Sequence, residues 1–118
     1  MKSTELAVLT KKIIEFRDKR NWKQFHNPKD LALSLVLEAG EVMEHFQWKS
    51  PQEIDAYIKT NKSDIGEELA DVLYWVLLMS HDLDLDIVEA VEKKMEKNEK
   101  HYPVEKAKGS HKKYTEIK

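Results

Sequence analysis

Apolar residues recur every three or four positions through most of the chain, which is the period of an amphipathic helix. The stripe is clear near the N-terminus, where four apolar side chains share one helical face: Leu6, Leu9, Ile13 and Phe16. No segment between turn residues alternates apolar and polar side chains in the way that a half-buried strand does. With three Gly and three Pro in 118 residues, the chain also contains few turn formers. The pattern predicts an all-α protein.

Helix-start signals, in which a capping side chain precedes Pro or an acidic residue, divide this pattern into five predicted helices. Their expected ranges are Ser3 or Thr4 to about Arg20, Asn27-Pro28 to near Gln47, Ser50-Pro51 to about Thr60, Ser63 or Asp64 to about His81, and Asp84 or Asp86 to Lys100. Tyr102-Pro103 stops the last helix. We therefore expect a helical domain over residues 1–103 and a basic tail over residues 104–118. The second and fourth helices are the most apolar, so we expect them to pair within a compact bundle of four to five helices.

Composition narrows the class of protein. A chain of 118 residues can bury one core, and without cysteine it can form neither disulfides nor a Cys-ligated zinc site. The net charge of −2 comes from many charges of both signs, which favours neither a nucleic-acid polymer nor a membrane surface as partner. The N-terminal segment lacks the apolar run of a signal peptide, and no uncharged apolar run approaches about 18 residues. We therefore expect a cytoplasmic protein.

Four carboxylates interrupt the most apolar segments of the chain. Glu38 and Glu41 lie in the middle of the second predicted helix, and their spacing places both on one face, one turn apart. Glu68 and Asp71 repeat this spacing in the fourth predicted helix. Gly40, between the first two acids, costs about 1 kcal/mol of helix propensity relative to Ala, which suggests close approach of another helix or a ligand. The alternative is that the acids are ordinary first-turn or surface residues, which fits the second pair better than the first.

If the second and fourth helices pack together, the four acids can converge. Like charges about 4 Å apart repel by roughly 4 kcal/mol per pair at an effective dielectric constant of 20, so such a cluster needs a cation. Carboxylate oxygens suit Mg²⁺, with Mn²⁺ as the alternative, and Mg²⁺ readily accepts phosphate oxygens. A di-iron site is the rival, but it needs Glu-x-x-His on two helices. Here His45 directly follows Glu44, and His81 lies far beyond Asp71.

The order of these acids also resembles a known family. Glu38-Ala-Gly-Glu41, a spacer of 26 residues and Glu68-Leu-Ala-Asp71 resemble the ExxE…ExxD signature of the MazG-like, all-α nucleoside triphosphate pyrophosphohydrolases. The flanking segments are most similar to the dCTP pyrophosphatase branch: WKQFHNP at 22–28, FQWKS at 46–50, HYP at 101–103 and KYTE at 113–116. The resemblance therefore extends over nearly the whole chain.

The resemblance implies Mg²⁺-dependent cleavage of a nucleoside triphosphate into monophosphate and pyrophosphate, with dCTP or a modified dCTP as the expected substrate. It also implies nucleotide-pool housekeeping by a homo-oligomer, either a dimer or a tetramer, whose sites are built partly by a neighbouring subunit. The four acids would hold the metal: Glu38, Glu41, Glu68 and Asp71. Glu38 or Glu41 would also orient and deprotonate the attacking water, and the sequence does not decide between them. The role of Glu44 is undecided: it is either a further metal ligand or an ordinary surface residue.

The resemblance also assigns the nucleoside-binding residues. Trp22 and Trp48 would line the base pocket, where stacking is worth about 1–3 kcal/mol per base and tolerates any base. His26 would then help to read the base edge. Taken alone, a Trp in a helix connection is more often a cap over the core, and His26 reads as an ordinary loop histidine.

The phosphate-binding residues would come from the C-terminal third of the chain. Lys94, Asn98 and Tyr102 recur every fourth residue and form one polar stripe. The resemblance implies that this stripe faces the phosphates and the sugar of the substrate. The alternative is an ordinary solvated helix face. Lys113 and Tyr114 in the basic tail would close over the triphosphate, and a disordered tail is the alternative.

Two rival functions follow from the same residues. One is a MazG-like hydrolase with a different or broad nucleotide preference. The other is a non-enzymatic oligomerisation or binding module that keeps the acids as a structural metal site. All four acids are intact, and a purely structural module does not need all four, so the sequence favours an enzyme.

Overall fold

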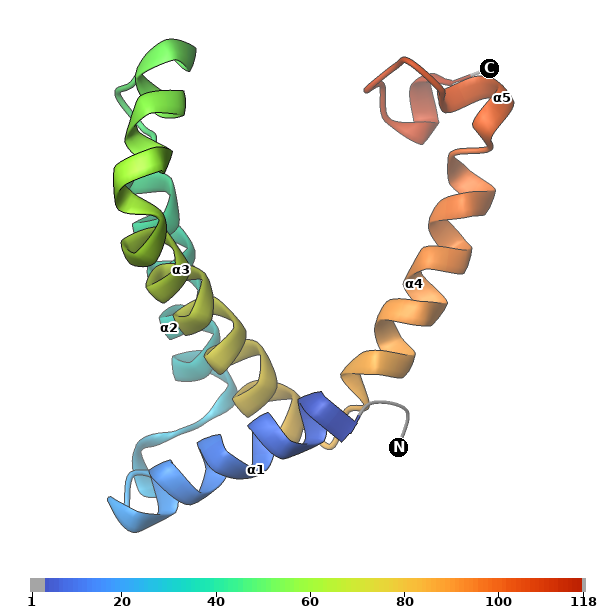
Figure 1. Ribbon diagram of the computed structural model, residues 1–118. Helices are drawn as coiled ribbons and strands as arrows, with labels where there is room; N and C mark the ends of the chain where they lie inside the picture. The colour runs from blue at the N-terminus through green and yellow to red at the C-terminus, as the bar shows by residue number, and fades with distance from the viewer. Residues whose placement is uncertain (1–3, 118) are drawn as a thin grey trace. The chain divides into compact units, whose positions relative to one another are not determined.

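The computed structural model describes residues 4–117, and over that range it consists of helices and their connections (Figure 1). The elements are α1 (Thr4–Lys19), η1 (Lys23–Phe25), α2 (Pro28–Glu44), α3 (Pro51–Asp82), α4 (Ile87–His101), α5 (Val104–Ala107) and η2 (Tyr114–Glu116). The predicted all-α fold is confirmed. None of the helices in the described range is both long and apolar enough to cross a membrane.

The starts of α2 and α3 confirm the predicted caps. The side chain of Asn27 accepts a hydrogen bond from the Asp30 backbone N–H at 3.0 Å, and Pro28 occupies the first turn. At α3, the Ser50 hydroxyl accepts from the Glu53 backbone N–H at 3.2 Å, while the Glu53 carboxylate accepts from the Ser50 N–H at 2.9 Å. This reciprocal pair satisfies two backbone donors that would otherwise be unpaired. For the first helix, the proposed cap Ser3 lies outside the described residues.

The predicted boundary between a third and a fourth helix coincides with a kink, at which two helical segments join to form α3. α3 continues through this region with a kink at Asn61, whose φ of −123° and ψ of 20° are not helical. The Asn61 side-chain amide donates to the Tyr57 carbonyl at 3.0 Å, so the distortion is compensated locally. Ser63 and Asp64 therefore lie inside the helix and cap nothing.

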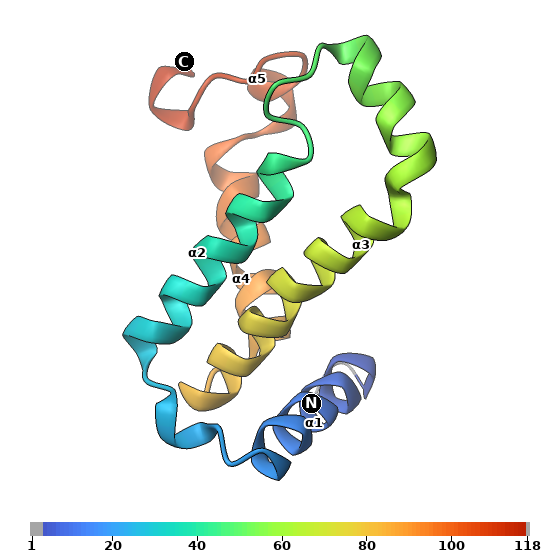
Figure 2. The same ribbon diagram turned by 90° about the vertical axis from the view of Figure 1, so that its left-hand side faces the viewer.

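Helices α1 to α3 form one compact unit, which ends at Leu85. Within it, α2 and the second half of α3 run antiparallel and side by side, which confirms the predicted pairing (Figure 2). α1 packs against α3. Leu31, Leu77 and Leu78 are at most 2% exposed and form the centre of the core.

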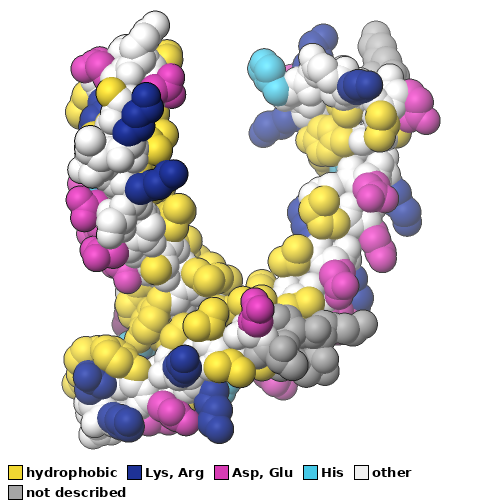
Figure 3. All heavy atoms as spheres, viewed as in Figure 1, with side chains coloured by type: hydrophobic (Ala, Val, Ile, Leu, Met, Phe, Trp, Pro, Cys, Tyr) yellow, Lys and Arg dark blue, Asp and Glu magenta, His cyan; other side chains and the backbone are white. Residues whose placement is uncertain are grey.

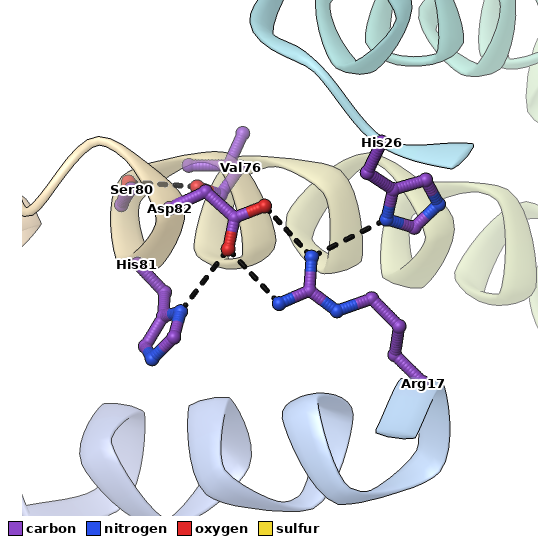
Figure 4. A network of polar contacts seen from close by, with 6 residues as sticks. All are labelled: Arg17, His26, Val76, Ser80, His81 and Asp82. Atoms are coloured by element: carbon purple, nitrogen blue, oxygen red, sulfur yellow. Dashed lines mark hydrogen bonds and ion pairs between the residues drawn. The ribbon is translucent and has the colours of Figure 1, made fainter. Parts of the chain in front are cut away.

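The core also contains a charged group. The Arg17 side chain is fully buried and donates two hydrogen bonds to the Asp82 carboxylate, at 2.7 and 3.0 Å (Figure 4). His26 Nδ1 lies 3.3 Å from the same guanidinium, and His81 Nδ1 lies 3.2 Å from the Asp82 carboxylate. This network joins α1, the end of α3 and the connection before α2. A buried charge is tolerated only when it is paired in this way.

The second unit begins at Asp86, whose side chain accepts from the Glu89 backbone N–H at 3.1 Å and caps α4. α4 ends before Pro103, as predicted. Tyr114 in the tail packs against the end of α4, with its ring centroid 3.9 Å from that of His101 and 6.1 Å from that of Tyr102. The predicted functional division into residues 1–103 and 104–118 stays a prediction.

Candidate metal centre and nucleotide site

Three of the four predicted acids meet between α2 and α3. Glu38 and Glu41 lie one turn apart on α2, and the antiparallel α3 brings Glu68 beside them. One carboxylate oxygen from each residue lies within 4.8 Å of the other two. We call Glu38, Glu41 and Glu68 the acid trio. Asp71 is exposed and lies one turn beyond Glu68, and its charge still raises the pKa of both Glu38 and Glu68.

The acid trio is electrostatically strained without a cation. The neighbouring Glu41 carboxyl is the largest cause that raises the pKa of Glu68, to about 7, and desolvation and the charges of Glu38 and Asp71 add to it. Burial followed by Glu41 raises the pKa of Glu38. One oxygen of Glu38 and one of Glu68 are buried and have no hydrogen-bond partner among the described residues. Unpaired buried carboxylate oxygens are costly, and a bound cation would remove that cost.

The donor set fits a hard divalent ion. All three side chains of the trio offer oxygen atoms, which Mg²⁺ and Mn²⁺ prefer. An open pocket of about 340 Å³ adjoins the trio, so water and phosphate oxygens could complete the coordination. The pocket is lined by Glu41, Glu44, His45, Tyr57 and Glu68.

Sequence reasoning missed two residues of this pocket wall. His45 lies four positions after Glu41, so its position on the same helical face could have been read from the spacing. No spacing rule could have identified Tyr57, because it lies on α3 and comes to the pocket only where the chain folds back between α2 and α3. Glu44, left open from the sequence, lies on the pocket wall and outside the acid trio.

The two tryptophans of the predicted base pocket differ in their surroundings. The Trp48 side chain is 87% exposed, so it adds little to the core of its own chain. Trp22 is 43% exposed, and its ring lies edge-on to Phe16 with centroids 5.8 Å apart. The core-cap alternative therefore suits Trp22 better than Trp48.

His26 is not brought near the acid trio within this chain. It lies before the first residue of α2, and at 1.5 Å per residue about 15 Å of helix separates Pro28 from Glu38. Its ring packs edge-on to Trp75 at 5.7 Å, and burial followed by the charge of Arg17 lowers its pKa. The structure therefore shows His26 as part of the buried Arg17 network, and its role in reading a base stays a prediction.

The predicted phosphate-binding residues all belong to the second unit. Lys94, Asn98 and Tyr102 follow one another at four-residue spacing on and just after α4, with Asn98 half-buried. The structure brings Tyr114 against Tyr102, and Lys113 directly precedes η2. Their roles stay predictions.

One structural expectation about the site needs correction. A Cβ atom added to Gly40 would meet no other atom within 4 Å. The small residue between the first two acids is therefore not required by another helix of the same chain. Approach of a ligand or of a second copy to this position stays a prediction.

Comparison with known proteins places these residues in a family. The sequence model of the MazG-like family matches residues 33–117, which include the acid trio and Asp71. Over 105 residues the chain is 41% identical to dCTP pyrophosphatase 1 of Mus musculus and 39% identical to that of Homo sapiens. In both cases 87% of this chain matches, and the match spans 62% of the relative's length.

A solved structure agrees with the sequence matches. The crystal structure of a pyrophosphatase from Archaeoglobus fulgidus DSM 4304 superimposes with a TM-score of 0.81 at 38% sequence identity. The superposition covers 87% of this chain and 96% of the archaeal one. The family model, the sequence matches and the structural match each cover most of the chain, and the chain belongs to the MazG-like family.

Proposed function

We propose that this protein is a divalent-metal-dependent nucleoside triphosphate pyrophosphohydrolase, with dCTP or a modified dCTP as its leading substrate. The observation that carries the proposal is the acid trio with its unpaired buried oxygens. The names of the similar proteins support the reaction and the base, because they include dCTP pyrophosphatase 1 and an archaeal pyrophosphatase. We assign this activity to nucleotide-pool housekeeping in the cytoplasm.

The acids divide the chemical work. Glu38, Glu41, Glu68 and Asp71 would hold Mg²⁺, which when bound offsets the negative charge that develops on the departing pyrophosphate. Glu38 or Glu41, through an oxygen not used for ligation, would orient a water molecule and accept its proton. The water oxygen attacks the α-phosphorus, and the bond to the oxygen that bridges the α- and β-phosphates breaks. The products are a nucleoside monophosphate and pyrophosphate.

Substrate binding extends beyond the acid trio. Trp48, exposed at the end of the α2–α3 turn, would stack on the base, and Trp22 and His26 would complete that pocket. Lys94, Asn98 and Tyr102 would contact the phosphates and sugar, and Lys113 and Tyr114 would close over them. Trp22 lies before the start of α2 and Trp48 lies after its end, so we propose that a neighbouring subunit completes the site.

The surface of α2 and α3 supports a homo-oligomer. Hydrophobic side chains lie exposed along this pair of helices (Figure 3). On α2, Val36 and Leu37 are 66% and 68% exposed. Together these exposed residues are Leu33, Val36, Leu37 and Met43 on α2, and Leu69 and Leu73 on α3. An apolar surface of this kind is typical of an interface between copies, and a dimer and a tetramer are both compatible with it.

The direct test is a panel of ribo- and deoxyribonucleoside triphosphates with Mg²⁺, in which monophosphate and pyrophosphate are both quantified. We expect dCTP or a modified dCTP to have the highest kcat/KM of the panel. A different best substrate would support the MazG-like hydrolase of other preference. Absence of hydrolysis for every triphosphate would favour the non-catalytic module.

Metal binding should stabilise the fold as well as permit turnover. We expect Mg²⁺ or Mn²⁺ at about 100 times its Kd to stabilise the native state by about 2.7 kcal/mol, because the ion binds the folded acid trio and not the unfolded chain. Thermal melts with metal and with EDTA measure this. Glu67→Gln, next to the trio and outside it, is the matched control and should keep the metal response. Full hydrolysis in excess EDTA would contradict the proposal.

Trp48→Ala should separate base binding from stability. If Trp48 stacks on the base, its loss should raise KM by roughly 5- to 150-fold, which corresponds to about 1–3 kcal/mol, with little change in kcat. The melting temperature should hardly change, because the side chain is 87% exposed. KM and melting temperature are measured on the same variant. A lowered melting temperature with an unchanged KM would make Trp48 a structural residue.

A further inference from the structure

The turn that carries Trp48 is held by a single residue of the next helix. Residues 45–50 link α2 to α3, and three side chains around Trp48 contact Tyr57. His45 Nδ1 lies 2.5 Å from the Tyr57 hydroxyl, a short hydrogen bond. The Phe46 ring lies edge-on to the Tyr57 ring at 6.4 Å, and the Lys49 ammonium lies 4.2 Å from the centre of that ring. Trp48, between these anchored neighbours, has an exposed side chain.

The backbone of the turn is closed as well. The Phe46 N–H donates to the Met43 carbonyl at 2.9 Å, and the Lys49 N–H donates to the Phe46 carbonyl at 3.2 Å. The Lys49 ammonium donates to the His45 carbonyl at 2.6 Å. Hydrogen bonds therefore hold the chain on both sides of Trp48.

Tyr57 is itself fixed by the helix in which it lies. Its carbonyl accepts the Asn61 side-chain amide at the kink of α3, at 3.0 Å. The start of the same helix is closed by the reciprocal Ser50–Glu53 cap. The residue that contacts the turn is therefore part of a rigid element, which is the usual support for a precise binding group.

The acid chemistry does not account for these contacts. His45 and Tyr57 line the pocket beside the acid trio, yet neither belongs to the trio. Because the Trp48 side chain is exposed, an ordered turn around it adds little to the stability of the fold. It can raise the affinity for a ligand that stacks on Trp48, because ordering a loop on binding costs affinity and a pre-formed loop avoids that cost.

We propose that Tyr57, acting through the hydrogen bond between its hydroxyl and His45 Nδ1, is a positioning residue that holds the turn so that Trp48 is ready to stack on the nucleobase. The inference rests on the proposed function, in which Trp48 binds the base. The ring of Tyr57 packs against Phe46 and Lys49, and these ring contacts constrain the orientation of the turn less than a hydrogen bond does. The bond to His45 is directional and sets the orientation of the turn.

The test is Tyr57→Phe, which keeps the ring and removes the hydroxyl. We expect KM for the preferred nucleotide to rise by roughly two- to tenfold, the range of one net hydrogen bond, with kcat nearly unchanged. Inhibition by inorganic tripolyphosphate, which has no base to stack, should be unchanged. His45→Leu should reproduce the effect, whereas His45→Asn, which keeps an acceptor near the position of Nδ1, should restore most of the affinity.

A spectroscopic measurement reports on the turn without any nucleotide. The chain has three tryptophans, so 5-fluorotryptophan labelling yields three fluorine resonances that Trp→Phe variants assign. We expect Tyr57→Phe to shift or broaden the Trp48 resonance. Tyr74→Phe is the matched control, since it makes the same change on the same helix, where the ring packs edge-on to Phe16 at 6.4 Å. It should leave the Trp48 resonance and KM unchanged.

Each outcome decides the inference. An unchanged Trp48 resonance and KM in both Tyr57→Phe and His45→Leu would overturn it. Equal weakening of nucleotide and tripolyphosphate would also overturn it, because Tyr57 would then be a phosphate contact. If the wild-type protein hydrolyses triphosphates while these variants behave normally, only this inference fails. If the wild-type protein hydrolyses none, the proposed function fails first and takes the inference with it.

Discussion

Glu41→Gln is expected to lower kcat by about two orders of magnitude or more and to leave the helical fold intact. Glu41 belongs to the acid trio and also lines the adjoining pocket, so its carboxylate serves as a metal ligand or as the base for water. Loss of a positioned base alone costs about 10²- to 10⁴-fold. The effect should fall on kcat more than on KM, because charge held near the leaving pyrophosphate matters most in the transition state.

The same substitution should reduce the electrostatic repulsion within the acid trio of the metal-free protein. The Glu41 carboxyl is the main cause of the raised pKa of Glu68, so Glu41→Gln should lower that pKa from about 7 toward its ordinary value. NMR titration of the Glu68 carboxyl measures the shift, and the melting temperature in EDTA should not fall. Asp71→Asn should also nearly abolish turnover, and Glu67→Gln should retain it. Wild-type activity in either the Glu41 or the Asp71 variant would remove that residue from the site.

Among the substitutions proposed for this protein, Asp82→Ala is expected to lower the free energy of unfolding most, by about 3–5 kcal/mol. The reason is that it leaves the buried Arg17 guanidinium without its counter-charge. Chemical denaturation measures the free energy of unfolding. The double variant Arg17→Met, Asp82→Leu removes both charges and should be closer to wild type than Asp82→Ala. Equal stability of wild type and Asp82→Ala would show that the ion pair contributes nothing.

The same ion pair predicts that the free energy of unfolding falls at acidic pH. Hydrogen bonding from Arg17 holds the pKa of Asp82 below its ordinary value of about 3.9. A depressed carboxyl pKa stabilises the fold above the unfolded value, and this contribution is lost as the pH falls through the folded value. Stability of the wild type should therefore drop below about pH 4, and Asp82→Ala should lack this component. Unfolding free energies measured between pH 7 and pH 2 test both statements.

The sequence by itself determined the features that depend on neighbours along the chain. The caps at Asn27 and Ser50, and Asp86 as one of two candidates, were predicted because each joins a side chain to a backbone N–H three residues later. The convergence of Glu38 and Glu41 followed from helical spacing alone. The pairing of α2 with the second half of α3 followed from their apolar character, because the most apolar helices bury the most surface against each other.

The sequence located an interruption of the helix near residue 61, but the tertiary structure decided its form. Cap signals predicted that one helix ends at about Thr60 and the next begins at Ser63 or Asp64, and the two segments in fact join at a kink at Asn61 without a separate cap. The Asn61 side chain compensates the distorted backbone, and the packing of α3 on α2 supports the helix beyond it. A local cost in helix propensity is small compared with burial, so tertiary packing decides such positions.

Contacts between distant residues were decided only by the tertiary structure. The ion pair between Arg17 and Asp82 joins residues 65 positions apart, and no spacing rule connects them. The bond between His45 and Tyr57 depends on how the chain turns between α2 and α3. The acid trio likewise needs α3 to lie beside α2 in one register, which places Glu68 with Glu38 and Glu41 and leaves Asp71 at the edge. Periodicity shows which face of a helix carries a residue, but only packing against another helix determines what that residue meets.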